Sequence, residues 1–135
     1  VMILNFFYQI AKAIQFIHTR DVIHFDIKPQ NILIDTEFDD NPLLADLGYA
    51  KKISNQGRKT VIGFTFTYAH PSLILWAREK KSISRTKIEL IPKEEHKKYD
   101  IYAFAKSILE ILKIVNRKFS TKYVFTFSSL QNARW

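Results

Sequence analysis

Three polar residues of different chemistry stand close together in an otherwise apolar stretch near the start of the chain. They are Asp26, Lys28 and Asn31, at spacings of two and three. A carboxylate can accept a proton, an ammonium group can neutralise a phosphoryl oxygen, and an amide oxygen can ligate a hard metal ion. Pro29 lacks a backbone donor and disfavours helix at Lys28, so we expect a loop anchored at both ends by buried apolar residues. This combination suits a phosphate–metal site.

The segment before this loop predicts a helix. Apolar residues recur at helical spacing over residues 4–18, and His18 and Arg20 favour the last turn. The predicted apolar face consists of Leu4, Phe7, Tyr8, Ala11, Ile14, Phe16 and Ile17. We interpret this helix as a packing element that feeds the loop.

A hairpin and a sharp turn are predicted directly after the loop. Residues 32–35 and 43–45 each indicate a short strand, and the acidic turn over residues 36–41 joins them. Asp46-Leu47-Gly48 follows, fifteen positions after Asn31. Gly48 allows backbone angles that a residue with a Cβ resists, as a sharp turn requires.

The stretch around the three polar residues resembles the catalytic loop of the eukaryotic protein kinases, H-R-D-x-K-x-x-N. His24, Asp26, Lys28 and Asn31 match this pattern, and Phe25 replaces its Arg. The resemblance implies that Asp26 orients a substrate hydroxyl and takes its proton, while Lys28 stabilises charge on the transferring phosphoryl group. A lysine two residues after the aspartate is the serine/threonine-type arrangement, so the implied substrate is a protein with a Ser or Thr hydroxyl.

Asp46-Leu47-Gly48 resembles the kinase D-F-G motif, with Leu in place of Phe. Taken alone, such a tripeptide is also a common turn or helix-capping sequence. Its position behind a predicted hairpin favours the functional interpretation, because the hairpin delivers this aspartate in the family. The resemblance then implies that Asn31 and Asp46 hold Mg²⁺ ions, that Lys28 helps them bind ATP, and that His24 and Gly48 are structural.

The segment between Gly48 and Pro71 is polar and basic, and it resembles an activation segment. Its end matches the pattern T-x-x-Y-x-A-P-E at Thr65, Tyr68 and Pro71. The resemblance implies that Thr65 forms hydrogen bonds near Asp26 and helps to seat the substrate hydroxyl.

Besides Leu47, three residues depart from the kinase patterns. Ser72 stands where a Glu forms a buried ion pair, and an Arg left without that partner would cost about 3–5 kcal/mol. His70 replaces a small Ala at a packed position. Phe25 replaces the Arg that pairs with phosphate on the activation segment, and phenylalanine cannot form that pair. We therefore predict that phosphorylation of Ser54 or Thr60 is not an on-switch acting through position 25.

The middle of the chain is strongly charged. Residues 73–76 predict a short apolar helix, and residues 78–98 then carry eight cations against four glutamates. The resemblance implies that residues 78–98 are an insertion. This segment fits either a solvated loop or a docking patch for an acidic partner.

A second strong helix is predicted from Tyr99. Asp100 suits its start by capping and by the helix dipole. The resemblance implies that the Asp100 carboxylate also holds backbone donors of the catalytic loop. The predicted apolar face consists of Ile101, Phe104, Ala105, Ile108, Leu109, Leu112 and Val115.

These elements predict an α+β chain that is mostly α-helical. The resemblance implies that residues 1–115 are an incomplete kinase C-terminal lobe, without the N-terminal lobe and the final helices, and residues 116–135 stay unassigned. The chain starts with Val rather than Met and its three glycines form no G-x-G-x-x-G, so we expect a fragment of a longer protein. By itself this piece should bind Mg-ATP poorly and phosphorylate nothing.

Composition narrows the class of protein further. A net charge of +8 allows acidic partners, but no nucleic-acid motif accompanies it, and a solvated lysine-rich surface explains it equally. The absence of cysteine fits a reducing, intracellular and cytoplasmic setting. Polar residues interrupt the apolar run over residues 4–18, so we expect no membrane span there, and no signal-peptide pattern is present.

Three readings of the chain stay open at this point. The first is a piece of an active serine/threonine kinase, favoured because all four chemical residues are present. The second is a pseudokinase or scaffold module that binds protein partners, suggested by Phe25, Ser72 and the basic segment 78–98. The third is a truncated gene product without a function of its own.

Overall fold

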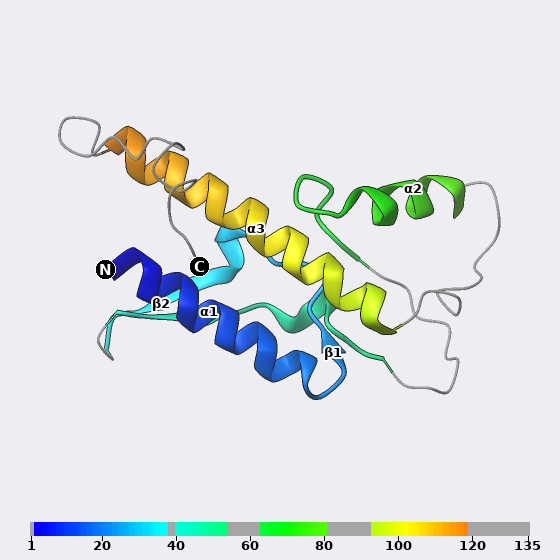
Figure 1. Cartoon of the computed structure of the whole chain (residues 1–135), viewed down its shortest axis with the longest axis horizontal. Coiled ribbons are helices and arrows are strands. Elements are labelled where there is room, and N and C mark those ends of the chain that lie inside the picture. The colour runs from blue at the N-terminus through cyan, green and yellow to red at the C-terminus, as the bar shows by residue number, and fades with distance from the viewer. Residues whose placement is uncertain (1, 38–39, 54–62, 81–92, 119–135) are drawn as a thin grey trace, which may run out of the picture.

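The computed structural model describes residues 2–37, 40–53, 63–80 and 93–118 (Figure 1). In chain order these residues form α1 (Met2–His18), β1 (Val22–Ile23), a 3₁₀ turn (Pro29–Asn31), β2 (Ile32–Asp35), β3 (Asn41–Leu44), a second 3₁₀ turn (Leu47–Tyr49), β4 (Lys51–Lys52), α2 (Pro71–Lys80) and α3 (Lys93–Lys118). The described chain is thus mostly helical, as predicted, and has two small sheets, of which the pair β1–β4 was not predicted. Ser54, Thr60, residues 81–92 of the basic segment and residues 119–135 of the tail lie outside the described residues.

The two longest of these helices, α1 and α3, lie side by side and run in opposite directions, while α2 lies beyond α3 (Figure 1). Nothing among the described helices is both long enough and apolar enough to cross a membrane. The chain passes from α1 through β1 into the loop that carries Asp26, and from this loop into β2. The loop therefore lies between the two long helices and the hairpin.

Two antiparallel pairs of strands frame this loop. β2 pairs with β3 from Ile32 opposite Leu44 to Asp35 opposite Asn41, so the predicted hairpin is present. The second strand occupies residues 41–44 rather than 43–45. The Ala45 N–H still donates to the Asn31 carbonyl oxygen at 2.8 Å in the same register, and the pairing ends there because Asn31 belongs to the 3₁₀ turn at Pro29–Asn31. The second pair joins β1 to β4, which follows the 3₁₀ turn at Leu47–Tyr49.

The predicted apolar face of α1 was only partly right. Phe7, Ile10 and Ile14 are buried along one stripe, and Ile10 was not in the prediction. The predicted core residues Leu4, Tyr8 and Phe16 are instead exposed, with 71%, 59% and 57% of their surface accessible. Spacing alone could not separate two adjacent apolar stripes, and contact with β3 and α3 decides which one is buried.

The second strong helix starts earlier than predicted. α3 begins at Lys93, so Asp100 lies about two turns inside the helix and does not cap it. Its predicted apolar face was also partly wrong, because Ile101 is 54% exposed and Leu109 44% exposed. Ala105 is exposed as well. The buried residues of this stretch include Ala103, Phe104 and Ser107.

The short helix predicted over residues 73–76 is longer in the structure. α2 spans Pro71–Lys80, and Pro71 stands at its first position. Proline suits that position because its fixed φ matches the helix and its missing N–H has no partner there. Leu73, in the first turn, is buried and is the part of α2 that joins the core.

The core consists of two clusters, and the loop contributes to both. Ile27 and Ile32 pack into the first cluster, whose other buried members are Phe7, Ile10, Ile14, Tyr68, Ala103 and Phe104. Ile23 and Phe25 pack into the second, with Ala69, Leu73 and Tyr99. Fully burying one such large apolar side chain stabilises the fold by about 1.5–3 kcal/mol. Asp26 therefore lies between two apolar neighbours that are anchored in different clusters.

Candidate active site

Asp26 is the centre of a network of hydrogen bonds. Its Oδ1 atom accepts from the Thr65 backbone N–H at 3.0 Å and from the Thr65 hydroxyl at 2.6 Å. Its Oδ2 atom accepts from Lys28 Nζ at 2.7 Å and from Asn31 Nδ2 at 3.1 Å. The structure thus brings together four residues that the sequence analysis assigned to one site, although Thr65 lies 39 positions away.

These contacts occupy the whole carboxylate. An ionised carboxylate offers about four lone-pair sites, and four donors already use them. Lys28 Nζ also donates to the Thr65 hydroxyl oxygen at 3.0 Å, so that hydroxyl both accepts and donates within the network. A substrate hydroxyl can approach Asp26 only by replacing one of these donors.

The surroundings of Asp26 favour its charged form. Burial of the carboxyl, which is 3% exposed, acts to raise its pKa. Hydrogen bonds from Lys28 and Thr65, the charge of Lys28 and the Asn31 amide outweigh burial and hold the pKa of Asp26 below its ordinary value. Asp26 is therefore a carboxylate at neutral pH, suited to orient a hydroxyl and to accept its proton late in a transfer.

Asn31 has its amide oriented by the same residue. Its Nδ2 donates to the Asp26 carbonyl oxygen at 2.8 Å as well as to the carboxylate. Because both donors of the amide are used by Asp26, its Oδ1 atom is the part left to meet a ligand. The Asn31 carbonyl oxygen accepts a hydrogen bond from the Ala45 N–H, and Asp46 is the residue that follows Ala45 in the chain.

The turn that carries Asp46 differs from the prediction in one respect. Asp46, not Gly48, adopts the left-handed backbone conformation, with φ 61°. Gly48 has no positive φ; its N–H donates to Asp46 Oδ1 at 3.2 Å. A Cβ at position 48 would approach that oxygen to 3.0 Å. Gly48 thus allows a close approach to the aspartate and does not itself supply the left-handed backbone angles, which aspartate tolerates better than most residues.

The carboxylate of Asp100, in α3, accepts hydrogen bonds from two backbone N–H groups of the loop. Its Oδ2 accepts from the His24 N–H at 2.8 Å and its Oδ1 from the Phe25 N–H at 2.9 Å. These are backbone donors of the loop that the resemblance assigns to Asp100. His24 Nε2 lies 3.1 Å from the Ala45 carbonyl oxygen, so His24 also connects the loop to the turn before Asp46.

Two histidines of this region were missed by the sequence analysis. His18 Nε2 lies 2.8 Å from Asp100 Oδ2, although His18 was interpreted only as a favourable residue at a helix end. His96 is 2% exposed and packs against Phe25 and Tyr99. His18 and Asp100 are 82 positions apart, and no local pattern in the sequence connects them.

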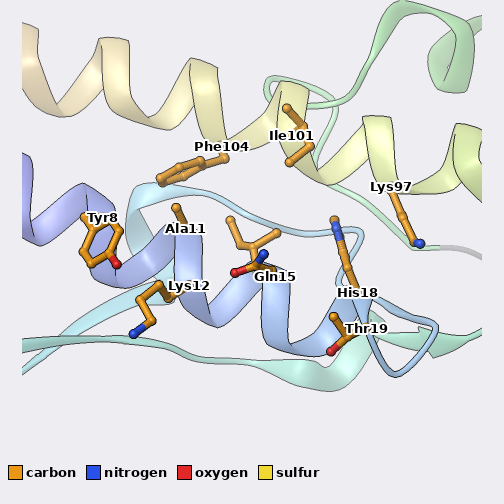
Figure 2. A pocket seen from close by; sticks show the side chains of 10 residues that line it. Tyr8, Ala11, Lys12, Gln15, His18, Thr19, Lys97, Ile101 and Phe104 are labelled. Atoms are coloured by element: carbon orange, nitrogen blue, oxygen red, sulfur yellow. The ribbon is translucent and has the colours of Figure 1, made fainter.

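A groove of about 560 Å³ lies between α1 and α3 (Figure 2). Tyr8 and Ile14 of α1 and Ile101 and Phe104 of α3 line it, and His18 lies at its border. None of the residues predicted for catalysis or metal binding is among its lining residues. The groove is therefore separate from the Asp26 network and meets it only through the contact of His18 with the residue that holds the loop.

The residues present fit a magnesium ion held together with phosphates. Mg²⁺ prefers oxygen ligands and is usually bound by one or two side chains plus substrate phosphates, which matches Asn31 Oδ1 and the exposed carboxylate of Asp46. Among the described residues, no group of three or more histidine, cysteine or acidic side chains could hold a metal by itself. The donor set thus suits a shared metal site rather than an all-protein cage.

The comparisons with known proteins agree with this geometry. The family model described as protein kinase domain matches residues 2–114. The chain belongs to the protein kinase family. It is 42% identical over 67 residues to a Caenorhabditis elegans protein named cyclin-dependent kinase 4 homolog, a match that covers 50% of this chain and 16% of that protein.

Two further relatives are of the same kind. The human serine/threonine-protein kinase ULK3 is 38% identical over 69 residues, covering 51% of this chain and 15% of that protein. Aurora kinase B of Drosophila melanogaster is 39% identical over 67 residues, covering 50% and 20%. These matches each span a fifth or less of the relative's own length, so they establish the family and leave the activity of a whole protein to be proposed.

Proposed function

We propose that this chain provides the catalytic part of a protein serine/threonine kinase, which transfers the γ-phosphate of ATP to a Ser or Thr hydroxyl. The arrangement of Asp26 with Lys28, Thr65 and Asn31 is the observation that carries the proposal. The name of one relative, the human serine/threonine-protein kinase ULK3, supports the serine/threonine class. We assign residues 1–115 to an incomplete C-terminal lobe of the kinase domain, and residues 116–135 to a tail outside it.

Each residue of the network has a role in this proposal. Asp26 accepts a hydrogen bond from the substrate hydroxyl and takes its proton, and Thr65 fixes the rotamer of Asp26 through two bonds to one oxygen. Lys28 Nζ lies 2.7 Å from the Asp26 carboxylate, and its charge neutralises charge on the transferring phosphoryl group. Such positioning and charge stabilisation supply most of the rate enhancement in phosphoryl transfer.

Asn31 and Asp46 are the residues that would hold Mg²⁺. Held by these two residues, the ion would supply positive charge that neutralises the phosphates. Other residues of the chain fix the orientation of these two side chains. Asp26 holds the Asn31 amide, and the left-handed turn closed by Gly48 holds Asp46. His24 and Asp100 fix the backbone between these two elements.

The chain should act only as part of a longer protein. No glycine-rich loop occurs within its 135 residues, so residues that would cover the ATP phosphates from the other side are not among them. We expect the 135-residue chain alone to bind Mg-ATP poorly and to transfer no phosphate above the level of an Asp26→Ala control. An intracellular, cytoplasmic location belongs to the same proposal, because ATP is the phosphate donor.

The decisive experiment uses the native protein that carries this chain. Its transcript is sequenced beyond both ends, and the encoded protein is assayed with Mg-ATP and Ser- or Thr-containing peptides. We expect Asp26→Asn to lower the rate by at least about 100-fold, the lower end of what general base catalysis contributes. Asp35→Asn, at an aspartate of β2 outside the network, is the matched control. Turnover that survives Asp26→Asn would overturn the assignment, and a native reading frame that begins near Val1 would favour a truncated gene product.

A pseudokinase or scaffold module is the second candidate. Phe25, Ser72 and the cationic segment 78–98 favour it, since two of these change regulatory or structural positions and the third suits an acidic partner. This candidate requires that the intact protein binds partners without turnover. Capture of an acidic peptide that is lost when lysines 80, 81, 97 and 98 become glutamine would support the docking role of that segment.

A further inference from the structure

The residue before Asp26 is held by an aromatic cluster. Phe25 is 5% exposed, and its ring lies 6.1 Å from that of His96 and 6.4 Å from that of Tyr99. The rings of His96 and Tyr99 are 6.0 Å apart, so each member of this cluster contacts both others. We call Phe25, His96 and Tyr99 the aromatic anchor.

The anchor fixes a backbone conformation that phenylalanine rarely adopts. Phe25 has φ 65°, in the left-handed region that is unfavourable for a bulky side chain. Such a conformation costs on the order of 1–3 kcal/mol and persists only where the surroundings determine it. Three interactions do so here, and one of them spans Phe25, because the Asp26 N–H donates to His24 Nδ1 at 3.3 Å. The Phe25 N–H donates to Asp100 at 2.9 Å, and the Phe25 ring is buried in the anchor. Because Asp26 is the next residue, the backbone conformation of Phe25 sets the direction of the Asp26 side chain.

His96 is the unusual member of the anchor. Both of its ring nitrogens are buried and neither has a hydrogen-bond partner among the described residues. Burial lowers the pKa of His96 below its ordinary value, and the charge of Glu95 only partly opposes this. A neutral imidazole already loses hydrogen bonds to water in this position, and an imidazolium would lose far more.

Among the described residues, the other ionisable groups around the anchor do not compensate a charge on His96. Glu95 of α3 attracts such a charge, and burial raises the pKa of Tyr99, so that phenol stays neutral. Asp100 is engaged with the loop backbone and His18. His70 contacts Tyr99 from the start of α2 and carries no negative charge. On the loop, Asp26 is already bound by four donors.

We propose that the aromatic anchor positions Asp26 by apolar packing, and that protonation of His96 releases this anchor and switches the site off in acid. Phe25 and His96 are positioning residues in this scheme, because they act through the backbone of Asp26 and touch no reacting atom. The inference about activity rests on the proposed kinase function. The inference about the loop does not.

The direction of the pH effect follows from linkage. His96 binds its proton more weakly in the folded anchor than in an opened one, so acid favours the opened state. The anchor is fully stable above the ordinary histidine value of 6.5 and loses stability as the pH falls through 6.5 toward the lower folded value. Between the midpoint of release and the lower folded value, the closed population falls about tenfold per unit, because opening takes up one proton there.

The first test needs no catalysis. NMR spectra of the full chain are recorded from pH 8 to pH 5, following the His96 ring and the backbone amides of Phe25 and Asp26. We expect the ring to titrate below 6.5 and the two amides to shift with the same midpoint. An ordinary or raised His96 pKa, or amides that do not follow the ring, would overturn the proposal.

Two variants separate His96 from general acid damage. His96→Phe keeps a ring in the anchor and cannot take up a proton, so both amides should stop responding between pH 7 and pH 5. His70→Phe, at the other histidine that contacts Tyr99, should leave the response as it is. A response unchanged in His96→Phe would contradict the proposal. If His96→Phe does not fold, the wild-type titration still decides the question.

The last test measures the activity of the intact protein as a function of pH. Wild-type turnover should fall about tenfold per pH unit on the acid side of the release midpoint, and His96→Phe should remove that limb while keeping the rate at pH 7.5. Turnover without this limb overturns the switch and keeps the kinase assignment. Absence of turnover at every pH contradicts the kinase assignment, and the NMR result on the anchor then stands by itself.

Discussion

His18 Nε2 donates a hydrogen bond of 2.8 Å to Asp100 Oδ2, although the two residues lie at opposite ends of the described chain. The same oxygen accepts from the His24 N–H, so one buried carboxylate joins α1, α3 and the loop that carries Asp26. Helix packing and loop geometry are therefore coupled through a single side chain that is fully buried.

Asp100→Asn should destabilise the fold, because an amide cannot accept from all three donors and places an N–H₂ group against one of them. A buried donor left without an acceptor costs about 1–3 kcal/mol. We expect a loss in this range in the free energy of unfolding, measured by urea denaturation of the full chain. Asp35→Asn, whose carboxylate accepts from the exposed Glu37 N–H, should change it by less than about 0.5 kcal/mol. Equal effects of the two variants would contradict the role of Asp100.

Lys28→Met should raise the pKa of Asp26 from its lowered value in the wild type. The variant removes the lysine's hydrogen bond and charge while burial of the carboxyl stays. In the wild type, the stabilisation by Asp26 is fully present above 3.8 and is lost as the pH falls from there through the lowered folded value. Carboxyl ¹³C NMR should therefore show the midpoint of Asp26 moving upward in Lys28→Met, and acid unfolding should begin at higher pH. The exposed Lys12→Met serves as control, and a pKa of Asp26 that stays low would refute this account.

Thr65→Val should weaken catalysis in the intact protein, while Thr65→Ser should not. Valine keeps the shape of threonine but lacks the hydroxyl that donates to Asp26 at 2.6 Å and accepts from Lys28. A hydrogen bond to a charged group contributes about 1.5–3 kcal/mol, which corresponds to roughly 10- to 100-fold in rate. Steady-state rates for the two variants give the answer, and equal activity would show that the backbone N–H of Thr65 alone orients Asp26.

Asp46→Asn should raise the Mg²⁺ concentration needed for half-maximal phosphotransfer by roughly tenfold, about 1.4 kcal/mol. The substitution removes the charge of a metal ligand but keeps an oxygen at the same place and an acceptor for the Gly48 N–H. A magnesium titration of the rate in the intact protein measures the effect. Asp40→Asn, at an exposed aspartate outside the site, is the control. An unchanged magnesium requirement would remove Asp46 from the metal site.

Replacing Ser54 and Thr60 by Ala should leave the activity of the intact protein in place. Phe25 cannot pair with a phosphate, and its position is determined by the apolar contacts of the aromatic anchor instead. Phosphotransfer rates of the double variant and the wild type are compared after treatment with and without a phosphatase. Loss of activity in the double variant would show that phosphate acts on the loop by another route.

The parts of the site that follow from local sequence were predicted well. Pro29 and the spacing of Asp26, Lys28 and Asn31 indicated a loop, and two short apolar stretches on either side of an acidic turn indicated the β2–β3 hairpin. The contacts of Thr65 with Asp26 agree with what the resemblance implied. These features depend on residues within one motif or on a pattern that the family repeats.

The failures concern tertiary contacts. Two adjacent apolar stripes on α1 have similar periodicity, and only packing against β3 and α3 selects the one with Ile10. The start of α3 was placed too late because the charged residues before Tyr99 looked like a loop. The left-handed turn was assigned to Gly48 because glycine is the usual residue there, whereas hydrogen bonding to Gly48 lets Asp46 adopt it. His96 gave no local signal at all.

The saturation of Asp26 has a consequence for substrate affinity. An arriving hydroxyl must exchange with a donor that is already bound, such as Lys28 Nζ at 2.7 Å, so the number of hydrogen bonds to the carboxylate stays the same. The exchange then contributes little net free energy of binding. Affinity for a substrate has to come from contacts outside the reacting group, and a free serine or threonine should be a poor substrate even where the chemistry is intact.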